Sequence, residues 1–252
     1  MKVTVCEIIA NPATLEAQWQ ALSTHVQDHH SEFLLLPEMP FSPWLCASEQ
    51  VTDDAWQQAI DSHEKWLTKV KQLPCHTILT LPVLENGKRL HRTVAIENGQ
   101  MSALHDKFYL PNEEYFWESN CYERGDGQFK AALIGEAKVG MQMCTEIWYQ
   151  EHSRHYGQQG THLLANPRAN YPEDQGIWKN ATVTAAYCSG NYVLTSNLLP
   201  EDLGAGVGAG AWVVNPAGET IAQTGPGEYM VTVNIDLHTA QQAKQTYPCY
   251  IK

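Results

Sequence analysis

The chain has 252 residues, of which 43% are hydrophobic and 17% charged, as in an ordinary globular protein of one large domain or two small ones. Its formal net charge of −12 argues against a surface built for nucleic acid or anionic membranes. No apolar run reaches the roughly 18 residues that a membrane-spanning helix requires, and the amino-terminal residues do not form the continuous apolar segment of a signal peptide. These features predict a cytoplasmic protein that binds neither nucleic acid nor membranes.

Seven cysteines are scattered along the chain without a CxxC pair or the dense spacing of a disulfide framework. Reduced thiols in a cytoplasmic protein are the simplest interpretation, and most of them are expected to be small core residues. The pairs His29-His30 and His152/His155 have suggestive spacing, but no second cluster of ligands accompanies either pair. The sequence therefore predicts no metal site.

Segments of strand and helix alternate through the first half of the chain. Alternating apolar residues or short apolar runs predict strands at residues 3–9, 32–36, 76–83, 92–96 and 104–107. Helical spacing of apolar residues predicts helices at residues 12–26 and 55–70. Asn86-Gly87 is typical of a two-residue turn, so the strands on either side of it are expected to form a hairpin.

The second half of the chain continues this alternation. Strands are predicted at residues 129–134, 139–143, 162–165, 192–196, 211–215, 219–223 and 229–235, and helices at residues 148–157 and 178–189. The glycine-rich segment 203–211 opens no helix, so we interpret it as a loop close to other backbone rather than as a nucleotide-binding loop. No repeat or linker interrupts the pattern, which predicts one α/β domain over residues 1–252 with helices layered on a sheet.

Three of the predicted strands end next to a chemically reactive side chain. Glu38 follows the strand in EFLLLPE, Lys107 ends the strand in SALHDK, and Cys144 follows the strand in VGMQMC. Proteins of the α/β class build their sites at such strand ends. A carboxylate can remove the proton that makes a thiol a poor nucleophile, and a buried ammonium can stabilise the thiolate and the oxyanion that its attack forms. Together the three residues predict nucleophilic catalysis by Cys144.

The segments around these residues, LLLPEMPF, HDKFYLPNEEYFWE and GMQMCTEIW, resemble the three catalytic blocks of the nitrilase superfamily of carbon–nitrogen hydrolases. The resemblance spans nearly the whole chain, and the later segments VLTSN and AWVVNPAGETIAQT resemble the strands that close that fold. It implies a four-layer α-β-β-α sandwich and a homodimer or higher homo-oligomer formed through the helix after the cysteine. The C-terminal tail, from about residue 237 to residue 252, is then a candidate to pack on the partner subunit.

The same resemblance implies a role for each residue: Glu38 is the general base, Lys107 the oxyanion stabiliser and Cys144 the nucleophile. The family often carries a second glutamate in the loop after the lysine. WESNCYERGD resembles that block, which makes Glu118 the residue expected to orient Lys107 and to assist proton transfer. Two alternatives lie nearby, at Glu113 and Glu114. The implied reaction is hydrolysis of a small-molecule amide or carbamoyl C–N bond through a thioester, and it needs neither cofactor nor metal.

The residues after the cysteine depart from the common pattern of the family, in which an arginine that often meets a substrate carboxylate follows three or four positions on. Ile147 and Trp148 stand there instead, so we expect an acidic amide or N-carbamoyl amino acid to be a poor substrate unless another cation replaces the arginine. Arg168 is the candidate for that cation, with a surface salt bridge as its alternative. Backbone N–H groups near Thr145 can face the oxyanion, and Trp148 and Trp117 can either line the pocket or pack.

Three other hypotheses stay open at this point. A nitrile could be the substrate, although nothing in the sequence selects nitriles. A catalytically silent relative could act as a binding protein, against which the intact set of glutamate, lysine and cysteine speaks. A papain-like enzyme would need a histidine at Cys144, and none of the 11 histidines lies in a recognisable supporting block.

Overall fold

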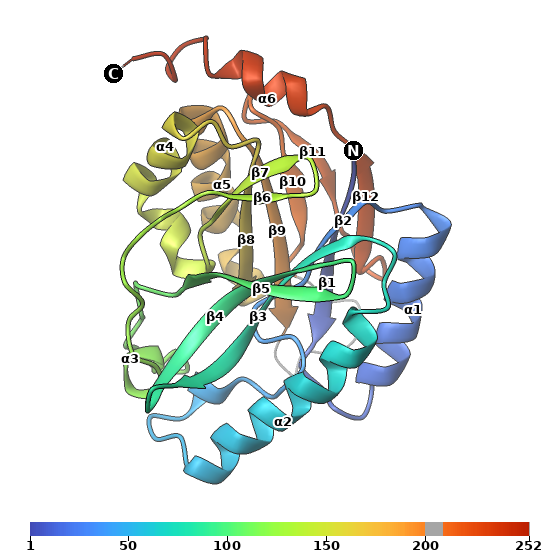
Figure 1. The fold of residues 1–252 in the computed structure, drawn as a ribbon, viewed down its shortest axis with the longest axis vertical. Coiled ribbons are helices and arrows are strands. Elements are labelled where there is room, and N and C mark those ends of the chain that lie inside the picture. The colour runs from blue at the N-terminus through green and yellow to red at the C-terminus, as the bar shows by residue number, and fades with distance from the viewer. Residues whose placement is uncertain (200–208, 252) are drawn as a thin grey trace.

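Two half-sheets share the strand β1 (Lys2–Ile9), which runs through the middle of the molecule (Figure 1). The computed structural model describes residues 1–199 and 209–251, so most of the glycine-rich segment 203–211 lies outside the described residues. Residues 3–5 of β1 pair with β2 (Phe33–Leu35), whereas residues 7–9 pair with β9 (Tyr192–Leu199). One continuous sheet of 12 strands is thereby divided into two halves that meet at β1.

The first half-sheet has the strand order β5-β4-β3-β2-β1. Its other strands are β3 (His76–Glu85), β4 (Lys88–Glu97) and β5 (Gln100–Asp106), and β12 (Met230–Asn234) pairs with β1. The expected hairpin joins β3 and β4, with Asn86 and Gly87 at φ of 52° and 78°. Positive φ at both central residues is the geometry that a tight hairpin turn demands.

The second half-sheet continues from β1 in the order β9-β8-β7-β6. These strands are β8 (Leu163–Ala169), β7 (Ala137–Met141) and β6 (Ala132–Ile134), and β10 (Trp212–Val214) and β11 (Thr220–Gln223) extend the sheet beside β9. Strands β7, β8 and β9 run parallel to one another, and β9 runs parallel to β1.

Alternation of side chains along the strands creates three apolar layers. On β1, Val3 and Val5 face a core shared with the second half-sheet, whereas Cys6 and Ile8 face a core under two helices. Those helices are α1 (Leu15–Asp28) and α2 (Asp53–Val70). On the far side, α4 (Gln150–Gln158) and α5 (Gln175–Ser189) cover the second half-sheet. The predicted four-layer α-β-β-α architecture is confirmed.

Two elements predicted near Cys144 differ from those in the structure. The strand expected at 129–134 is reduced to β6, because Phe129 leaves the sheet and its ring stacks on His152 with centroids 3.6 Å apart. The helix expected at 148–157 begins at Gln150 and is preceded by the 3-10 helix η2 (Cys144–Trp148). Cys144 therefore opens a tight turn rather than an α-helix.

The C-terminal tail contacts helices of its own chain. After α6 (Leu237–Ala243), the Lys244 ammonium donates to the Gly190 carbonyl and to Asn191 Oδ1, both at 2.9 Å. The Arg154 guanidinium on α4 donates to the Ile251 carbonyl. Packing of this tail on a partner subunit stays a prediction. Of the helices in the described part of the chain, none combines the length and apolar character needed to cross a bilayer.

Candidate active site

The carboxyl ends of the parallel strands bring the reactive residues to one edge of the double sheet. Glu38 follows the end of β2 at Leu35, and Cys144 follows the end of β7 at Met141. Both strands belong to the parallel set around β1, so the loops after them emerge on the same side. Lys107 follows directly on β5 and reaches the same place from the first half-sheet.

Glu38, Lys107 and Glu118, which we call the charged cluster, are completely buried. Lys107 Nζ lies 2.7 Å from Glu38 Oε1, and 2.8 and 2.7 Å from the two carboxylate oxygens of Glu118. Glu118 begins the short helix α3 (Glu118–Cys121), whereas the alternatives Glu113 and Glu114 are exposed. Of the three candidates Glu113, Glu114 and Glu118, Glu118 is therefore the one that contacts Lys107.

Burial and charge together set the protonation of this cluster. Burial raises the pKa of Glu38, and the Lys107 charge offsets only part of that effect. Burial and the Glu38 charge raise the pKa of Glu118 to about 8 against the opposing effect of Lys107. Burial also acts to lower the pKa of Lys107, but the charges of Glu118 and Glu38 outweigh it and hold that pKa well above its usual value. The cluster therefore favours a charged Lys107 and opposes ionisation of both carboxyl groups at once.

Cys144 sits at a strained position beside the charged cluster. Its φ is +46°, a conformation that residues other than glycine rarely adopt, and it is 4% exposed. Its Sγ points to the Ala169 carbonyl at 3.9 Å, and its proximity to Glu38 acts to lower the pKa of that carboxyl. Burial and the Glu38 charge raise the pKa of the thiol well above its usual value. The Cys144 side chain is thus a neutral thiol, and a thiol becomes a strong nucleophile only when it loses its proton.

The Glu146 carboxylate connects the segments that carry Lys107 and Cys144. It accepts hydrogen bonds from the backbone N–H of Phe108 and of Met143, both at 2.8 Å, and it pairs with His105 Nε2 at 2.8 Å. Burial acts to lower the pKa of His105, but the Glu146 charge and hydrogen bond outweigh it and raise that pKa. This contact was not predicted from the sequence. The pattern that could have indicated it is a glutamate two positions after Cys144 and a histidine two positions before Lys107.

A glycine closes the loop that carries Glu118. The backbone N–H of Gly125 donates to the Lys107 carbonyl at 3.0 Å. A Cβ at this position would lie 2.1 Å from the Asp106 carbonyl oxygen, so only glycine allows the loop to return so closely to the end of β5. The loop begins after Lys107 and returns to it, which places Glu118 against the Lys107 ammonium.

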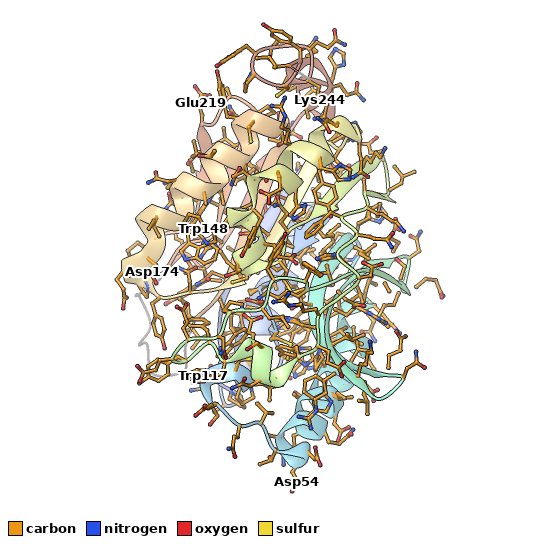
Figure 2. The ribbon with its side chains drawn as sticks, turned by 90° about the vertical axis from the view of Figure 1, so that its left-hand side faces the viewer. Asp54, Trp117, Trp148, Asp174, Glu219 and Lys244 are labelled. Atoms are coloured by element: carbon orange, nitrogen blue, oxygen red, sulfur yellow. The ribbon has the colours of Figure 1, made fainter. Side chains whose placement is uncertain are left out.

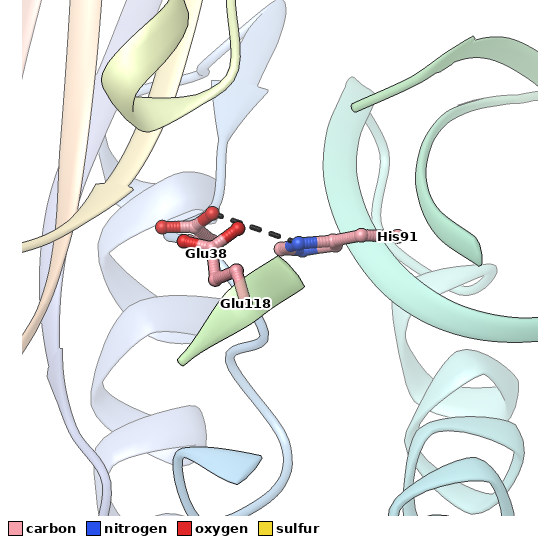
Figure 3. Close-up of side chains that lie close together, drawn as sticks. All are labelled: Glu38, His91 and Glu118. Carbon is pink, nitrogen blue, oxygen red and sulfur yellow. Dashed lines mark ion pairs between the residues drawn. The ribbon is translucent and has the colours of Figure 1, made fainter. Parts of the chain in front are cut away.

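Glu38, His91 and Glu118 together satisfy one geometric requirement of a metal site, as Figure 3 shows. One possible ligand atom from each lies within 4.8 Å of the other two. Lys107 Nζ, however, lies 2.7 Å from both carboxylates and already supplies a positive charge there. A cation would have to displace this ammonium or bind against its charge, so the donor set fits a lysine-centred cluster better than a metal.

The predicted binding residues lie in four different surroundings. They are Thr145, Trp148, Trp117 and Arg168. Thr145 follows Cys144 in η2 and is partly exposed. Trp148 is 41% exposed and packs on Trp178 of α5 with ring centroids 5.4 Å apart. Trp117 lies beside α3, where its backbone N–H donates to the Cys46 carbonyl at 2.9 Å (Figure 2).

Arg168 is completely buried, so its interpretation as a surface salt bridge was wrong. Its guanidinium donates to Asn170 Oδ1, to Asn197 Oδ1 at 2.9 Å and to the Gly210 carbonyl. The same group lies over the Trp212 ring, 4.1 Å from the centroid. Burial lowers the pKa of Arg168 to about 9. Its hydrogen bonds link the segment after β8 to strand β9 and to the segment before β10.

An apolar cavity of about 320 Å³ opens next to the thiol, since Ala169 both lines it and accepts from Cys144 Sγ. Residues that end or follow β1, β2, β8 and β9, together with the segment before Glu118, form what we call the aromatic cavity. Its lining residues are Ala10, Pro43, Trp44, Ala47, Tyr115, Phe116, Ala169, Asn170, Tyr171 and Leu198. Within residues 1–199 and 209–251, no charged side chain lines it.

Comparisons with known proteins agree with this geometry. The model of the carbon–nitrogen hydrolase family matches residues 2–245. The omega-amidase NIT2 of Bos taurus is 28% identical over 87% of this chain and 82% of its own length. The Homo sapiens omega-amidase NIT2 is 29% identical over 66% of this chain, but the match spans only 63% of that protein.

Solved structures show the same fold at low sequence identity. A carbon–nitrogen hydrolase from Helicobacter pylori G27 superposes with a TM-score of 0.85 and 20% identity, covering 99% of this chain and 94% of that one. An amidase variant from Nesterenkonia sp. AN1, with the acetamide moiety of fluoroacetamide bound covalently at its active-site cysteine, has a TM-score of 0.76 and 17% identity over 96% and 92% of the two chains. The family match over nearly the whole chain, on this fold, shows that the protein belongs to the carbon–nitrogen hydrolase family.

Proposed function

We propose that the protein hydrolyses the C–N bond of a small neutral amide, with Cys144 as the nucleophile. The observation that carries the proposal is the placement of the Lys107 ammonium between two buried carboxyl groups, with the Cys144 thiol close enough for their charges to shift its pKa. Among the described residues, Cys144 Sγ is within hydrogen-bond distance of the Ala169 carbonyl and of no histidine, which argues against a papain-like pair.

Acylation begins when Glu38 takes the thiol proton while Cys144 Sγ attacks the amide carbonyl carbon. The oxyanion that forms is stabilised by Lys107 Nζ and by backbone N–H groups near Thr145. When the oxyanion collapses, the C–N bond breaks and the leaving nitrogen takes a proton from the carboxyl groups of the cluster. Ammonia or an amine departs, and the acyl group remains on sulfur as a thioester.

Deacylation uses the same groups in reverse. Glu38 removes a proton from water, the resulting hydroxide attacks the thioester carbon, and Lys107 again stabilises the oxyanion. The C–S bond then breaks, the sulfur regains its proton from Glu38, and the carboxylic acid leaves. Because the pKa of Glu118 is raised to about 8, this residue can hold a proton at neutral pH and orient Lys107 at the same time.

The aromatic cavity supports a neutral substrate. A substrate carboxylate buried there would need a cationic partner, and the cavity offers none among the described residues. Arg168, the cation expected to take this role, instead donates to its own chain in a buried position. The relatives from cattle and humans are omega-amidases, so monoamides of dicarboxylic acids are the comparison that tests this part of the proposal.

The decisive experiment measures ammonia release from a panel of neutral amides, dicarboxylic monoamides, ureido compounds and nitriles, together with the mass of the protein during turnover. We expect a thioester adduct that maps to Cys144, and no adduct or hydrolysis in Cys144→Ala, which should fold normally. Hydrolysis by Cys144→Ala would refute the covalent mechanism. Binding without turnover by the parent protein would favour a silent binding protein, and preference for nitriles would change the substrate class.

We also propose a cytoplasmic homodimer that forms through α4, α5 and the C-terminal tail. Support comes from large apolar side chains that are exposed on α5 and the tail, at Ile177, Tyr187, Tyr247, Tyr250 and Ile251. All seven cysteines are free thiols, which suits a reducing compartment. Analytical ultracentrifugation tests the assembly: Tyr187→Asp should shift the parent dimer toward monomer, and a monomeric parent would contradict the proposal.

A further inference from the structure

A buried histidine that the reaction above does not use lies against the general base. His91 Nδ1 is 3.7 Å from Glu38 Oε1, the same oxygen that accepts from Lys107 Nζ, and both side chains are completely buried (Figure 3). We propose that His91 is a positioning residue: it carries its proton on Nδ1 and holds Glu38 through Oε1, so that Oε2 exchanges protons with the thiol and with water. This inference rests on the proposed function of Glu38 as the general base.

The sheet places His91 beside the catalytic lysine. His91 lies on β4, and its carbonyl accepts a hydrogen bond from the Lys107 backbone N–H at 2.9 Å. The antiparallel register that pairs Arg92 with Asp106 therefore puts His91 opposite Lys107. Strand pairing, rather than a mobile loop, thus determines where the imidazole meets Glu38.

A second contact of the ring identifies the nitrogen that carries the proton. His91 Nε2 lies 3.2 Å from Thr80 Oγ1, which itself accepts from the Met39 backbone N–H at 2.8 Å. The Thr80 hydroxyl can therefore donate its own proton to Nε2. The opposite tautomer would aim the lone pair of Nδ1 at the Glu38 carboxylate, which electrostatic repulsion disfavours. We assign the proton to Nδ1 on these grounds.

The surroundings keep the ring neutral and fixed. Burial lowers the pKa of His91 well below its usual value, and the charges of Lys107, His63 and His105 act in the same direction. On its face the ring stacks on Tyr122, with centroids 4.8 Å apart. A neutral N–H donor favours an ionised Glu38 without adding another charge to the cluster.

The hydrogen-bonding state of Glu38 explains why the contact with His91 matters for proton transfer. Among the described residues, Glu38 Oε2 and His91 Nδ1 have no partner within hydrogen-bond geometry. Oε1 is held by Lys107 and faces His91, which leaves Oε2 as the oxygen available to the thiol. The 3.7 Å contact is longer than a hydrogen bond, and such catalytic contacts commonly shorten when a substrate binds.

Three substitutions at position 91 separate donation from packing. His91→Asn keeps an N–H donor near the place of Nδ1, whereas His91→Gln places its amide near Nε2 and Thr80. His91→Phe keeps the ring that stacks on Tyr122 but removes both nitrogens. His63→Phe is the matched control, because His63 is an equally buried histidine whose Nδ1 hydrogen bond goes to the Ala59 carbonyl.

The measurements are kcat and KM for the best amide, and the pH dependence of Cys144 alkylation by iodoacetamide, followed on the Cys144 peptide. For His91→Phe and His91→Gln we expect kcat to fall about 10- to 100-fold with KM nearly unchanged. The acid limb of the alkylation profile should move up by about one pH unit, because loss of the donor raises the pKa of Glu38. His91→Asn should recover most of both effects, and His63→Phe should show neither.

Two outcomes would overturn the role of His91. Parent-like kcat and alkylation in His91→Phe would show that the donor does nothing. Equal losses in all three variants, matched by equal losses of Tm, would show a packing role instead. The alkylation profile needs no amide substrate, so a parent protein that hydrolyses nothing refutes the proposed function, while the shift of the acid limb still decides the role of His91.

Discussion

The charged cluster and the aromatic cavity lie side by side but are built in opposite ways. The cluster has no exposed surface, and its residues sit at strand ends or on a loop that Gly125 closes against β5. The cavity is open, apolar and lined by loops after several different strands. Strand ends can hold charges to within tenths of an ångström, whereas loops can change shape and size without disturbing the sheet.

This difference indicates a division of labour between the two regions. In the proposed reaction, the ammonium, the carboxyl groups and the thiol perform the same steps for any acyl group, since they act only on the carbonyl and the leaving nitrogen. The cavity is then the proposed place for the remainder of the substrate. Substitutions in the cluster should therefore reduce kcat for every substrate, and substitutions in the cavity should change the order of preference among substrates.

Removal of the central ammonium should produce the largest effect. Lys107→Met leaves two buried carboxyl groups without their cation and removes the main oxyanion stabiliser. We expect kcat to fall by at least about 10³-fold and the free energy of unfolding to fall by about 3–5 kcal/mol. Steady-state kinetics and urea unfolding measure the two effects.

Lys69→Met provides the matched control, because Lys69 forms a half-exposed salt bridge with Glu16 on the surface. It should change stability by less than about 1 kcal/mol and leave kcat unchanged. The double variant Lys107→Met/Glu118→Gln should regain part of the stability but none of the activity. Activity of Lys107→Met within tenfold of the parent would contradict the division between the two regions.

Glu146→Gln tests whether the hydrogen bonds that connect the Lys107 and Cys144 segments support catalysis. The amide of glutamine cannot accept from the Phe108 and Met143 N–H groups and from His105 together. A buried donor left unpaired costs about 1–3 kcal/mol, and we expect kcat to fall about 10- to 100-fold through loss of alignment. Glu151→Gln, on the exposed side of α4, is the control and should behave like the parent.

The pH dependence of stability should reveal the proton that the buried Glu118 carboxyl keeps in the folded protein. Its pKa rises from 4.5 to about 8 on folding, so between these values the folded protein keeps a proton that the unfolded chain has lost. Stability should therefore fall as the pH rises from 4.5 to about 8. Glu118→Gln should flatten this part of the curve in urea unfolding. An unchanged slope would mean that Glu118 is ionised in the folded protein.

Trp44→Ala should have the smallest effect and should act on specificity alone. Trp44 lines the aromatic cavity, and its Nε1 donates to the Tyr115 carbonyl at 3.0 Å. Its removal should raise KM for small neutral amides about three- to tenfold, favour bulkier amides, and leave Cys144 alkylation unchanged. Trp44→Phe should be intermediate. A proportional loss of kcat for all substrates would show that cavity and cluster are not independent.

Local sequence patterns predicted most of the fold because burial repeats with the period of each element. On β1 the alternation of Val3 and Val5 with Cys6 and Ile8 records two cores on opposite faces. Errors occurred where an aromatic ring left the pattern. Phe129 looked like a strand residue by composition, but it stacks on His152 from a loop. For Trp148 the sequence left pocket lining and packing open, and its ring packs on Trp178.

Site residues could be predicted where the chain itself marks them. Glu38, Lys107 and Cys144 stand at strand ends within recognisable motifs, and Glu118 lies in the expected loop. His91 lies inside a strand in an unremarkable context, so only the pairing of β4 with β5 shows that it faces Glu38. Arg168 had the expected type and location, yet its partners could not be read from the sequence.

By itself, the sequence determined the family, the alternation of strands and helices, and the groups available for chemistry, because each of these depends on residue type and local spacing. Only the tertiary structure decided their charge states and partners. Lys107 keeps its proton because two carboxyl groups from different segments are buried beside it, and Arg168 is occupied because strand β9 and the segments next to β8 and β10 converge on it. Burial and distance between remote segments produce both results, and neither quantity exists until the chain has folded.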